Sequence, residues 1–377
     1  MSNAPTSWPD VSLGEICEFK YGKSLPEEKR AGGEIAVYGS NGIVGRHNEP
    51  ITEGPAIIVG RKGSFGEVHL SSEPCWPIDT TYFIDSSATK TDLRWLAYRL
   101  KGLGLTRLNK AAAVPGLNRE DAYRQKLKLP PLAEQRRIAE VLDRAEALRA
   151  KRRATLAQLD SLAQSLFLNL FGYPGTNPKG WAKGTLGEVA TFVGGGTPSR
   201  ARPEFYSGSI CWATSKDMKC EVLDDTQEHI TEEAIEQSAT NLVSAGTVLI
   251  VVKSKILAHS LPVAIARVPT CFGQDLKGIK VSDRCDVVFA ATSLRLGKRW
   301  LLQRARGINT EGLTLDHLRA FPLLLPPMKL QREFARRVGE VDKLKTAQRA
   351  SLAEMDALFA TLQHRAFRGE LWPRSDR

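Results

Sequence analysis

Two long charged stretches of the chain, residues 129–172 and 325–377, repeat apolar residues every three or four positions, with one break in each that in the first stretch contains Arg152 and Thr155. In the first stretch these positions are Ile138, Leu142, Ala145, Leu148, Leu159, Leu162, Leu166 and Leu170. In the second they are Phe334, Val338, Val341, Leu344, Met355, Leu358 and Leu362. This spacing predicts an amphipathic helix with one apolar stripe in each stretch. A double proline precedes each stripe, and proline is tolerated at a helix start but not inside a helix.

The two helical stretches are copies of each other. "LPPLAEQRRIAEVLD" begins the first at residue 129, and "LPPMKLQREFARRV" begins the second at residue 325. The segments between them repeat more weakly, since "WPDVSLGEI" at 8–16 resembles "WAKGTLGEV" at 181–189. An internal repeat of this kind indicates that the fold contains the same structural unit twice. We therefore divide the chain into a globule at 1–128, a helix at 129–172, a globule at 173–324 and a helix at 325–377.

A single amphipathic helix cannot bury its own apolar stripe. We expect the two helices to pack on each other as an antiparallel coiled coil, with the two halves of the chain related by a pseudo-twofold axis. A helix of forty residues is about 60 Å long, so it would separate the globules widely. The alternative is that each helix docks on its own globule.

The sequences of the two globules predict mixtures of short strands and a few helices. Residues 34–70, "EIAVYGSNGIVGRHNEPITEGPAIIVGRKGSFGEVHL", alternate β-branched and aromatic runs with Asn-Gly, Glu-Gly and Lys-Gly turns. "GTVLIVVKSKI" and "PVAIARV" have the same character in the second globule. A helical piece ends each globule before its double proline. The predicted class is α+β, with two mixed α/β domains and two long helices.

Composition adds an electrostatic preference. The 377 residues include 53 Lys and Arg against 42 Asp and Glu, which favours a polyanionic partner. No stretch approaches the ~18 apolar residues of a membrane helix, and the N-terminus lacks the pattern of a signal peptide, so we expect a cytoplasmic protein without a membrane partner. The six cysteines and six histidines are scattered without metal-ligand spacing. We expect reduced thiols and no metal site.

Two motifs invite a catalytic interpretation. Asp10, Glu18 and Lys20 have the skeleton of a magnesium-dependent nuclease. The corresponding positions of the second copy are Lys183, Thr191 and Val193, which argues against catalysis. "FVGGGTPSR" at 192–200 lacks the lysine of a phosphate-binding loop, and a tight turn presenting backbone amides to a phosphate or ligand is the better interpretation. We predict no catalytic residues.

The sequence resembles the specificity (S) subunit of type I restriction–modification systems. The resemblance covers nearly the whole chain and rests on both "LPP" helix starts, the closing "HRAFRGEL", and the target-recognition stretches "GGGTPSRARPEFYSGSICWATSKDMK" and "YGKSLPEEKRAGGEIAVYGSNGIVGRHNE". It implies two target-recognition domains that each read half of a split double-stranded DNA site, with paired helices that set the spacer. It also implies two methylation (M) subunits and two restriction (R) subunits as partners. S-adenosylmethionine, ATP and magnesium would be bound by those partners, and this chain would bind no cofactor.

Base reading needs side chains that donate to base edges from loops held over a groove. Candidates in the first globule are Lys20, Lys23, Ser40, Asn41, Arg46, Arg61, Lys62, Ser64, Asn109, Lys110 and Asn118. Candidates in the second globule are Thr197, Ser199, Arg200, Arg202, Lys216, Lys253, Ser254, Lys255, Asn309 and Thr310. Asn41 lies in a "GSNG" turn, so it is equally well explained as a structural asparagine with positive φ.

The helix starts are candidate sites for partner proteins. Gln135 and Arg136, with Gln331 and Arg332 in the second copy, are the residues that we assign to partner binding. Basic residues further along the first helix, such as Arg149, either line spacer DNA or form an exposed flank of the coiled coil. Two rival functions remain, a free-standing nuclease or methyltransferase and a protein scaffold that reads no DNA.

Overall fold

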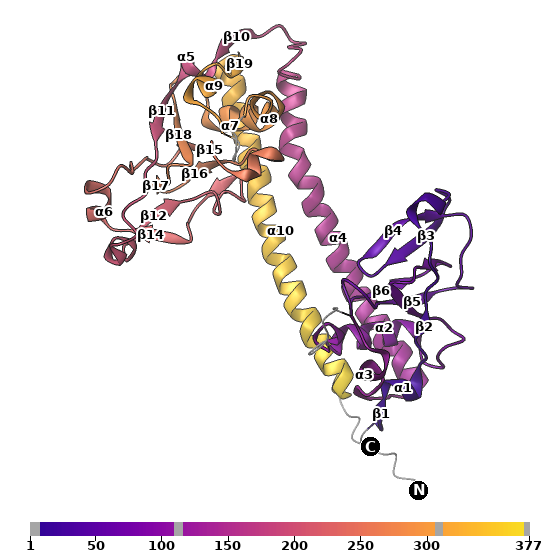
Figure 1. Cartoon of the computed structure of the whole chain (residues 1–377). Coiled ribbons are helices and arrows are strands. Elements are labelled where there is room, and N and C mark those ends of the chain that lie inside the picture. Colours follow the sequence, from indigo (N-terminus) through magenta and orange to yellow (C-terminus); the bar gives the residue numbers. More distant parts are fainter. Residues whose placement is uncertain (1–7, 109–115, 306–311, 373–377) are drawn as a thin grey trace. The chain divides into compact units, whose positions relative to one another are not determined.

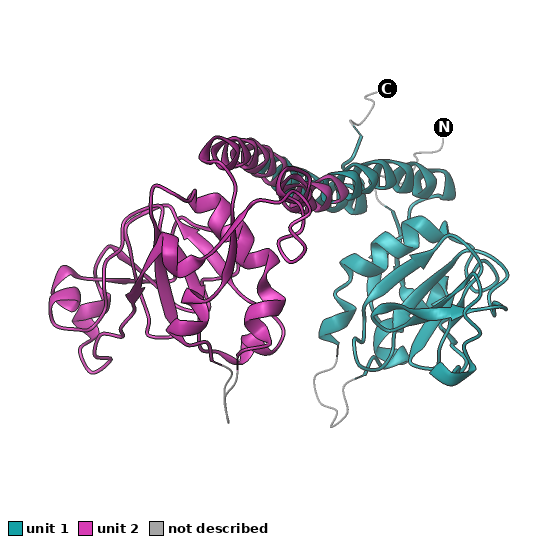
Figure 2. Ribbon diagram, turned by 90° about the horizontal axis from the view of Figure 1, so that it is seen from above, with its two compact units in different colours: residues 1–153, 350–377 teal, residues 154–349 magenta. Residues whose placement is uncertain are grey.

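The structure is a computed structural model that describes residues 8–108, 116–305 and 312–372 (Figure 1). The chain divides into two compact units, shown in different colours in Figure 2. Unit 1 contains residues 1–153 and 350–377, and unit 2 contains residues 154–349. The boundary falls inside both long helices, α4 (Leu132–Phe171) and α10 (Met328–Arg368). Both helices lie within the stretches in which the apolar pattern predicts them.

Unit 1 combines the short strands and helices of its globule with the first part of α4 and the last part of α10. Its strands are β1 (Asp10–Ser12), β2 (Lys20–Tyr21), β3 (Ile35–Gly39), β4 (Gly42–His47), β5 (Ala56–Gly60), β6 (Val68–Ser71), β7 (Trp76–Pro77), β8 (Thr81–Ile84) and β9 (Lys126–Lys128). Its helices are α1 (Leu13–Ile16), η1 (Glu27–Lys29), α2 (Leu93–Gly102), η2 (Leu105–Arg107) and α3 (Arg119–Tyr123).

Unit 2 is built from the same kinds of elements. Its strands are β10 (Ala182–Thr185), β11 (Ala190–Gly194), β12 (Ile210–Ala213), β13 (Val222–Leu223), β14 (Glu228–Ile230), β15 (Val248–Val251), β16 (Val263–Ala266), β17 (Thr270–Phe272), β18 (Leu276–Val281) and β19 (Pro322–Leu325). Its helices are α5 (Leu186–Val189), η3 (Pro203–Tyr206), α6 (Glu232–Glu236), η4 (Lys255–Ala258), α7 (Val287–Leu296), α8 (Lys298–Leu302) and α9 (Leu315–Arg319).

Each sheet of unit 1 has a counterpart in unit 2. A two-stranded antiparallel sheet joins β1 to β9 in unit 1 and β10 to β19 in unit 2. The main sheet has the order β2-β8-β5-β6 in unit 1 and β11-β18-β15-β16-β13 in unit 2. The third sheet, β4-β3-β7 or β14-β12-β17, has one antiparallel and one parallel pair in both units. Both units are thus mixed α+β, as the sequence predicts.

The long helices contribute to the hydrophobic core of each unit. In unit 1 the core takes Ile138 and Leu142 from α4 and Ala366 from α10. In unit 2 it takes Phe167 and Phe171 from α4 and Phe334 and Val338 from α10. Each long helix therefore contributes one segment to the core of unit 1 and another to the core of unit 2, so neither helix docks on a single globule of its own.

Ion pairs also connect α4 to α10 within each unit. In unit 1 the Arg149 guanidinium lies 2.6 Å from Asp356 and stacks on the Phe359 ring, with 4.3 Å between guanidinium carbon and ring centroid. In unit 2 the buried Lys345 ammonium lies 3.1 Å from Asp160. The Arg149 side chain is thereby engaged inside unit 1, so it does not provide the free cation that contact with spacer DNA requires.

Four leucines of the predicted stripes are not buried. Leu148, Leu162, Leu344 and Leu358 are all exposed, with 58%, 37%, 52% and 57% of their surface accessible. The prediction that the whole stripe is covered is wrong at these positions. The physical reason is that the globules cover the helix ends and leave apolar residues nearer the middle of each helix in solvent.

Helices α2 and α7 begin at matching aspartates. The Asp92 carboxylate accepts from the backbone N–H of Arg94 and Trp95, and Asp286 accepts from Val288 and Phe289. These bonds satisfy donors that have no partner inside the helix. We expect Asp92→Ala and Asp286→Ala each to cost about 1 kcal/mol of stability in urea unfolding. Glu120→Ala, an exposed control on α3, should change it by less than about 0.5 kcal/mol, and an equal effect of the control would contradict the capping role.

Five of the six cysteines are buried, Cys220 is exposed, and all six are free thiols. Burial raises the pKa of Cys17 and of Cys285 to about 12 and that of Cys271 to about 11, so these three stay protonated and unreactive at neutral pH. Over the described ranges, no helix has both the length and the apolar character needed to cross a membrane.

Candidate nucleic-acid interface

An exposed lysine occupies the same structural position in both units. Lys62 follows strand β5 and forms a β-bridge with Gly116, while Lys253 follows β15 and bridges Gly312. The next hydrogen bonds also match, since the N–H of Leu117 donates to Arg61 and that of Leu313 donates to Val252, over 2.8 and 2.7 Å. Both lysines therefore lie beside the chain segment that leads into α3 or α9.

A cluster of aromatic rings and guanidinium groups surrounds this position in unit 1. Tyr21 is 54% exposed and lies between two cations, with its ring centroid 5.3 Å from the Arg61 guanidinium and 5.5 Å from that of Arg119. The Tyr82 ring packs edge-on against Tyr21 at 5.1 Å. Burial raises the pKa of Tyr82 to about 12, so its phenol is neutral. An exposed aromatic ring between cations is suited to contact with a base or sugar and the neighbouring phosphates.

The sequence interpretation missed Tyr21 and Arg119. Arg119 follows the candidate Asn118, and Tyr21 lies between the candidates Lys20 and Lys23, but residue type and spacing do not show that they meet. Only the tertiary structure brings the Arg119 guanidinium to 5.5 Å from the Tyr21 ring, while β2 aligns Tyr21 with Tyr82 on β8. In unit 2 the corresponding pair on β11 and β18 is Gly194 with Lys277. The two candidate surfaces therefore differ in chemistry at this point.

In the predicted "GSNG" turn, Ser40 and Asn41 have different roles. Ser40 is buried, and its hydroxyl donates to the Thr80 carbonyl over 2.6 Å, so it stabilises the fold and does not face a ligand. Asn41 is exposed at the turn between β3 and β4. The positive φ of this turn belongs to Gly42, with a value of 103°, and not to Asn41. The structural explanation of Asn41 is thus wrong, and its amide remains available to a partner.

Several other candidates of unit 1 have partners within the unit. The Lys20 ammonium lies 3.0 Å from the Asp85 carboxylate, and Arg46 donates to the Glu34 carbonyl over 2.7 Å. Lys23 lies over the Trp76 ring at 5.8 Å but is exposed, and Ser64 is exposed as well. Asn118 caps α3 by accepting from the Glu120 N–H over 2.8 Å. These partners make Lys20 a support of the fold rather than a free phosphate contact.

Carboxylates neutralise the two arginines proposed for unit 2. Arg200 forms two parallel hydrogen bonds of 2.7 Å with Glu228. Arg202 lies 2.7 Å from Glu204 and 2.8 Å from Glu233. The Arg200 bonds lower the pKa of Glu228, so that pair is charged at neutral pH. Because a paired guanidinium attracts phosphate less, neither arginine is a free cation here.

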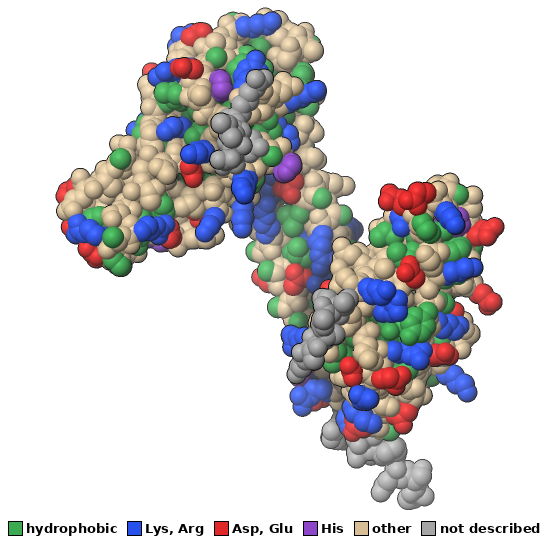
Figure 3. All heavy atoms as spheres, in the orientation of Figure 1, with side chains coloured by type: hydrophobic (Ala, Val, Ile, Leu, Met, Phe, Trp, Pro, Cys, Tyr) green, Lys and Arg blue, Asp and Glu red, His purple; other side chains and the backbone are tan. Residues whose placement is uncertain are grey.

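The remaining candidates of unit 2 lie at the surface. Thr197, Ser199, Lys216 and Lys255 are exposed, as is Lys253. Ser254 is partly buried and caps η4 by accepting from the Ile256 N–H. Four candidates lie outside the described residues: Asn109, Lys110, Asn309 and Thr310. Figure 3 shows one face of the chain, on which basic and acidic side chains alternate over unit 1 without forming a single basic stripe.

The motifs considered for catalysis have structural roles. Asp10 forms an ion pair of 2.8 Å with Lys128 across β1 and β9, and Lys20 pairs with Asp85, so two of the three charged residues of the nuclease skeleton are used elsewhere. In the glycine run, a Cβ on Gly195 would lie 2.2 Å from the Gly273 carbonyl oxygen. The N–H of Gly196 donates to the Phe272 carbonyl. The run thus permits close packing of the backbone, and the prediction that it presents free amides is wrong at Gly196.

The glutamines assigned to partner binding are buried inside their own units. The Gln135 amide accepts from the Asp92 N–H over 2.8 Å and donates to the Pro130 carbonyl over 2.8 Å. Gln331 makes the same two bonds, with Asp286 at 2.9 Å and Pro326 at 2.8 Å. Their assignment to a partner surface is therefore wrong for this structure. Arg136 and Arg332, the residues that follow them, are exposed.

Known proteins are similar to this chain, some in sequence over part of its length and others in architecture. The sequence model of a protein family, the type I restriction modification DNA specificity domain, matches residues 5–159 and 178–354. The specificity subunit of the Escherichia coli type I restriction enzyme EcoR124I/EcoR124II is 33% identical over 164 residues, which are 43% of this chain and 40% of that protein. The specificity subunit of the type I restriction enzyme MjaIX from Methanocaldococcus jannaschii is 29% identical over 112 residues, or 29% of this chain and 25% of that protein. The matched part is thus less than half of either curated relative.

Two solved structures share the fold over nearly the full length. The S subunit of a type I restriction-modification system from M. genitalium has a TM-score of 0.65 and 16% identity, covering 97% of this chain and 98% of that one. A chain from a structural study of complex assembly and conformational transition of the type I R-M system has a TM-score of 0.56 and 18% identity, covering 98% and 100%. With two matched segments that span most of its length, the chain belongs to the family of the type I restriction modification DNA specificity domain.

Proposed function

We propose that this chain is the DNA-sequence specificity subunit of a type I restriction–modification complex. Each unit reads one half of a bipartite double-stranded DNA site. The chain performs no catalysis and holds no cofactor, and two methylation subunits and two restriction subunits supply the S-adenosylmethionine, ATP and magnesium chemistry. The proposal assigns the reading of DNA to two surfaces that share a backbone but differ in side chains.

The matched placement of Lys62 and Lys253 is the observation that carries this proposal. An exposed lysine held by a backbone bridge suits phosphate contact, which fixes a protein on the duplex without reading sequence. Side chains around it then differ between units, with Tyr21 and Arg119 in unit 1 and Lys277 in unit 2. To read two different half-sites, the two units need the same phosphate contact but different side chains for contact with the bases.

The long helices are proposed as a spacer and an assembly surface. An antiparallel coiled coil of α4 and α10, with the pseudo-twofold relation of the two halves, would set the number of unread base pairs between half-sites. Two ion pairs support the antiparallel direction. Arg149 of α4 pairs with Asp356 of α10, whereas Asp160, further along α4, pairs with Lys345, which comes earlier in α10. The exposed Leu148, Leu162, Leu344 and Leu358 suit docking of the methylation subunits.

The test is to co-express the chain with a methylation subunit of its system in a host without DNA methylation and to sequence the modified bases. A split motif with methylated adenine in both halves, lost when this chain is omitted, is expected. Methylation at one continuous site would contradict two-domain reading. A stable complex that methylates nothing and binds no duplex selectively would favour the second candidate, a scaffold that joins partner subunits through the exposed leucines without reading DNA.

The two lysines provide a residue-level prediction. Lys62→Ala and Lys253→Ala should each weaken binding of the chain–methylation subunit complex to its bipartite duplex, and should each reduce the magnitude of the salt slope by about 1, because one phosphate contact is lost. The measurement is duplex affinity by fluorescence anisotropy across a salt series. The discrimination between cognate and mismatched half-sites should change little, since phosphate contacts carry no sequence information.

Matched controls come from the two-stranded sheets of the same units. Lys126 on β9 and Lys183 on β10 are exposed lysines outside the candidate surfaces. Lys126→Ala and Lys183→Ala remove the same charge and should leave the salt slope within about 0.3 of the parent. An equal loss in the controls would show that the complex responds to net charge alone and would contradict the assigned positions.

A further inference from the structure

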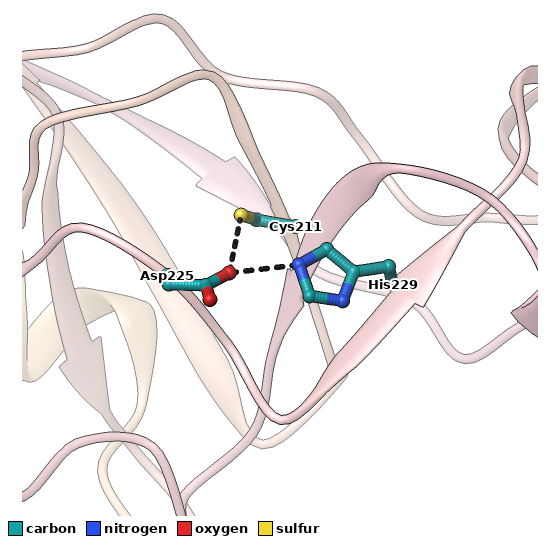
Figure 4. Close-up of side chains that lie close together, drawn as sticks. All are labelled: Cys211, Asp225 and His229. Atoms are coloured by element: carbon teal, nitrogen blue, oxygen red, sulfur yellow. Dashed lines mark hydrogen bonds and ion pairs between the residues drawn. The ribbon is translucent and has the colours of Figure 1, made fainter.

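Three side chains of different chemistry meet on the three-stranded sheet of unit 2 (Figure 4). Cys211 on β12 and His229 on β14 are direct cross-strand neighbours, and Asp225 lies in the segment before β14. The Cys211 sulfur lies 3.7 Å from Asp225 Oδ1, and the His229 Nε2 lies 2.8 Å from the same oxygen. All three potential ligand atoms lie within 4.8 Å of one another. We propose that Cys211, Asp225 and His229 bind one zinc ion.

The three ligand types suit zinc. Zinc is bound by cysteine sulfur at about 2.3 Å and by histidine nitrogen and carboxylate oxygen at about 2.0–2.2 Å, in tetrahedral geometry. Those bond lengths place sulfur and oxygen about 3.6 Å apart and nitrogen and oxygen about 3.4 Å apart. The sulfur–oxygen distance of 3.7 Å already fits. The histidine and carboxylate must separate by about 0.6 Å, which the 74% exposed Asp225 side chain allows.

The surrounding residues hold the ligands in place. Thr226 accepts from the Trp212 N–H over 3.1 Å and donates to the Glu228 carbonyl over 2.7 Å, which ties the Asp225 segment to β12. The Thr226 N–H donates to the Asp225 carboxylate over 2.8 Å. The Cys211 thiol is buried, and burial raises its pKa, so it is a neutral thiol until a cation replaces its proton. On binding, the sulfur–hydrogen bond breaks, the sulfur–zinc bond forms, and the proton passes to solvent.

The ion would link β12, β14 and the segment before β14, and a water molecule would complete its tetrahedral coordination. The β14-β12-β17 sheet packs on a small separate core of Phe205, Trp212, Ile230, Ala234 and Cys271. A small core gains more than a large one from a metal that links its strands. Unit 1 offers an internal comparison, because its corresponding cross-strand pair is Ala36 with Arg46, which has no ligand atoms for zinc. The proposal therefore concerns unit 2 alone and does not depend on the function proposed above.

The experiment measures zinc binding to the purified full chain. Metal is removed by dialysis against a chelator, zinc chloride is added, and bound zinc per chain is measured by mass spectrometry after desalting. Cobalt substitution gives a second readout, since thiolate ligation produces a charge-transfer absorption band. The variants are Cys211→Ser and His229→Gln, and the matched controls are Cys220→Ser and His259→Gln, which remove an exposed thiol and an exposed imidazole from the same unit.

The parent chain and both controls are expected to bind one zinc ion and to show the cobalt–thiolate band. Cys211→Ser should abolish the band, and both ligand variants should weaken zinc binding at least about tenfold, since even loss of a supporting outer-shell contact costs that much. Zinc should also raise the melting temperature of the parent but not of the variants. His229 is partly exposed, so its replacement tests the site even if Cys211→Ser folds poorly. Absence of binding by the parent, or equal binding by His229→Gln, would overturn the proposal.

Discussion

Replacing Gln135 or Gln331 with alanine is expected to lower the free energy of unfolding of its unit by about 2–4 kcal/mol. Each amide makes two hydrogen bonds, one from the aspartate that begins α2 or α7 and one to the proline carbonyl before the long helix. Both glutamines are buried, at 4% and 0% exposure, so water cannot replace the lost partner. The measurement is urea unfolding of the purified chain, followed by hydrogen exchange in each unit.

Two further variants separate the hydrogen bonds from packing. Gln135→Met keeps the side-chain volume and removes both hydrogen bonds, so it should lose most of the same free energy. Arg136→Ala, at the exposed neighbouring position, should change stability by less than about 0.5 kcal/mol. If Gln135→Met were as stable as the parent, the amide would not be what fixes the helix to the globule.

The glutamines also show what a sequence pattern can and cannot predict. The repeated "LPP" and the glutamine six residues after each leucine correctly predict two helices with the same start. The pattern does not tell whether the amide faces outward to a partner or inward. That choice depends on backbone groups 43 or 45 residues earlier in the chain, which only the tertiary structure brings into reach.

The positions of the candidate DNA-binding residues in the fold are predictable to a similar extent. The Lys-Gly turn at residues 62 and 63 predicts a loop, and the structure places Lys62 at the surface in a position that unit 2 repeats with Lys253. The neutralisation of Arg200 was not predictable, because Glu228 is 28 residues away and meets it only through folding. Tyr21 and Arg119 were missed for the same reason, since they are 98 residues apart and converge on one face.

The exposed leucines show that the spacing of apolar residues does not predict which of them are buried. Spacing of three and four residues shows that side chains share a helix face, but not what covers that face. Phe334 and Leu344 belong to the same predicted stripe, yet Phe334 is fully buried and Leu344 is 52% exposed. The difference arises because the globule of unit 2 covers only the first part of α10. Under the proposed function, the uncovered part of the stripe is the part assigned to assembly with the methylation subunits.

Replacing Phe334 with alanine should be the most destabilising of these changes, at about 3–5 kcal/mol for unit 2. Its ring contacts Phe167 and Phe171 of α4, with centroids 5.5 and 5.6 Å away, and Phe171 packs on Phe289 of α7 at 4.9 Å. Loss of the ring therefore opens a cavity where both long helices meet the globule. Guanidinium unfolding, with hydrogen exchange localised to residues 154–349, measures the effect.

The matched control is Leu344→Ala on the same helix, which should cost far less because the leucine is already in water. The pair then distinguishes two roles of one apolar stripe. Phe334→Ala should destabilise unit 2 in the isolated chain, whereas Leu344→Ala should leave the isolated chain stable and weaken its association with a methylation subunit in a pull-down or titration. If Leu344→Ala destabilised the isolated chain as much as Phe334→Ala, the stripe would serve folding alone, and the assignment of its exposed part to assembly would be wrong.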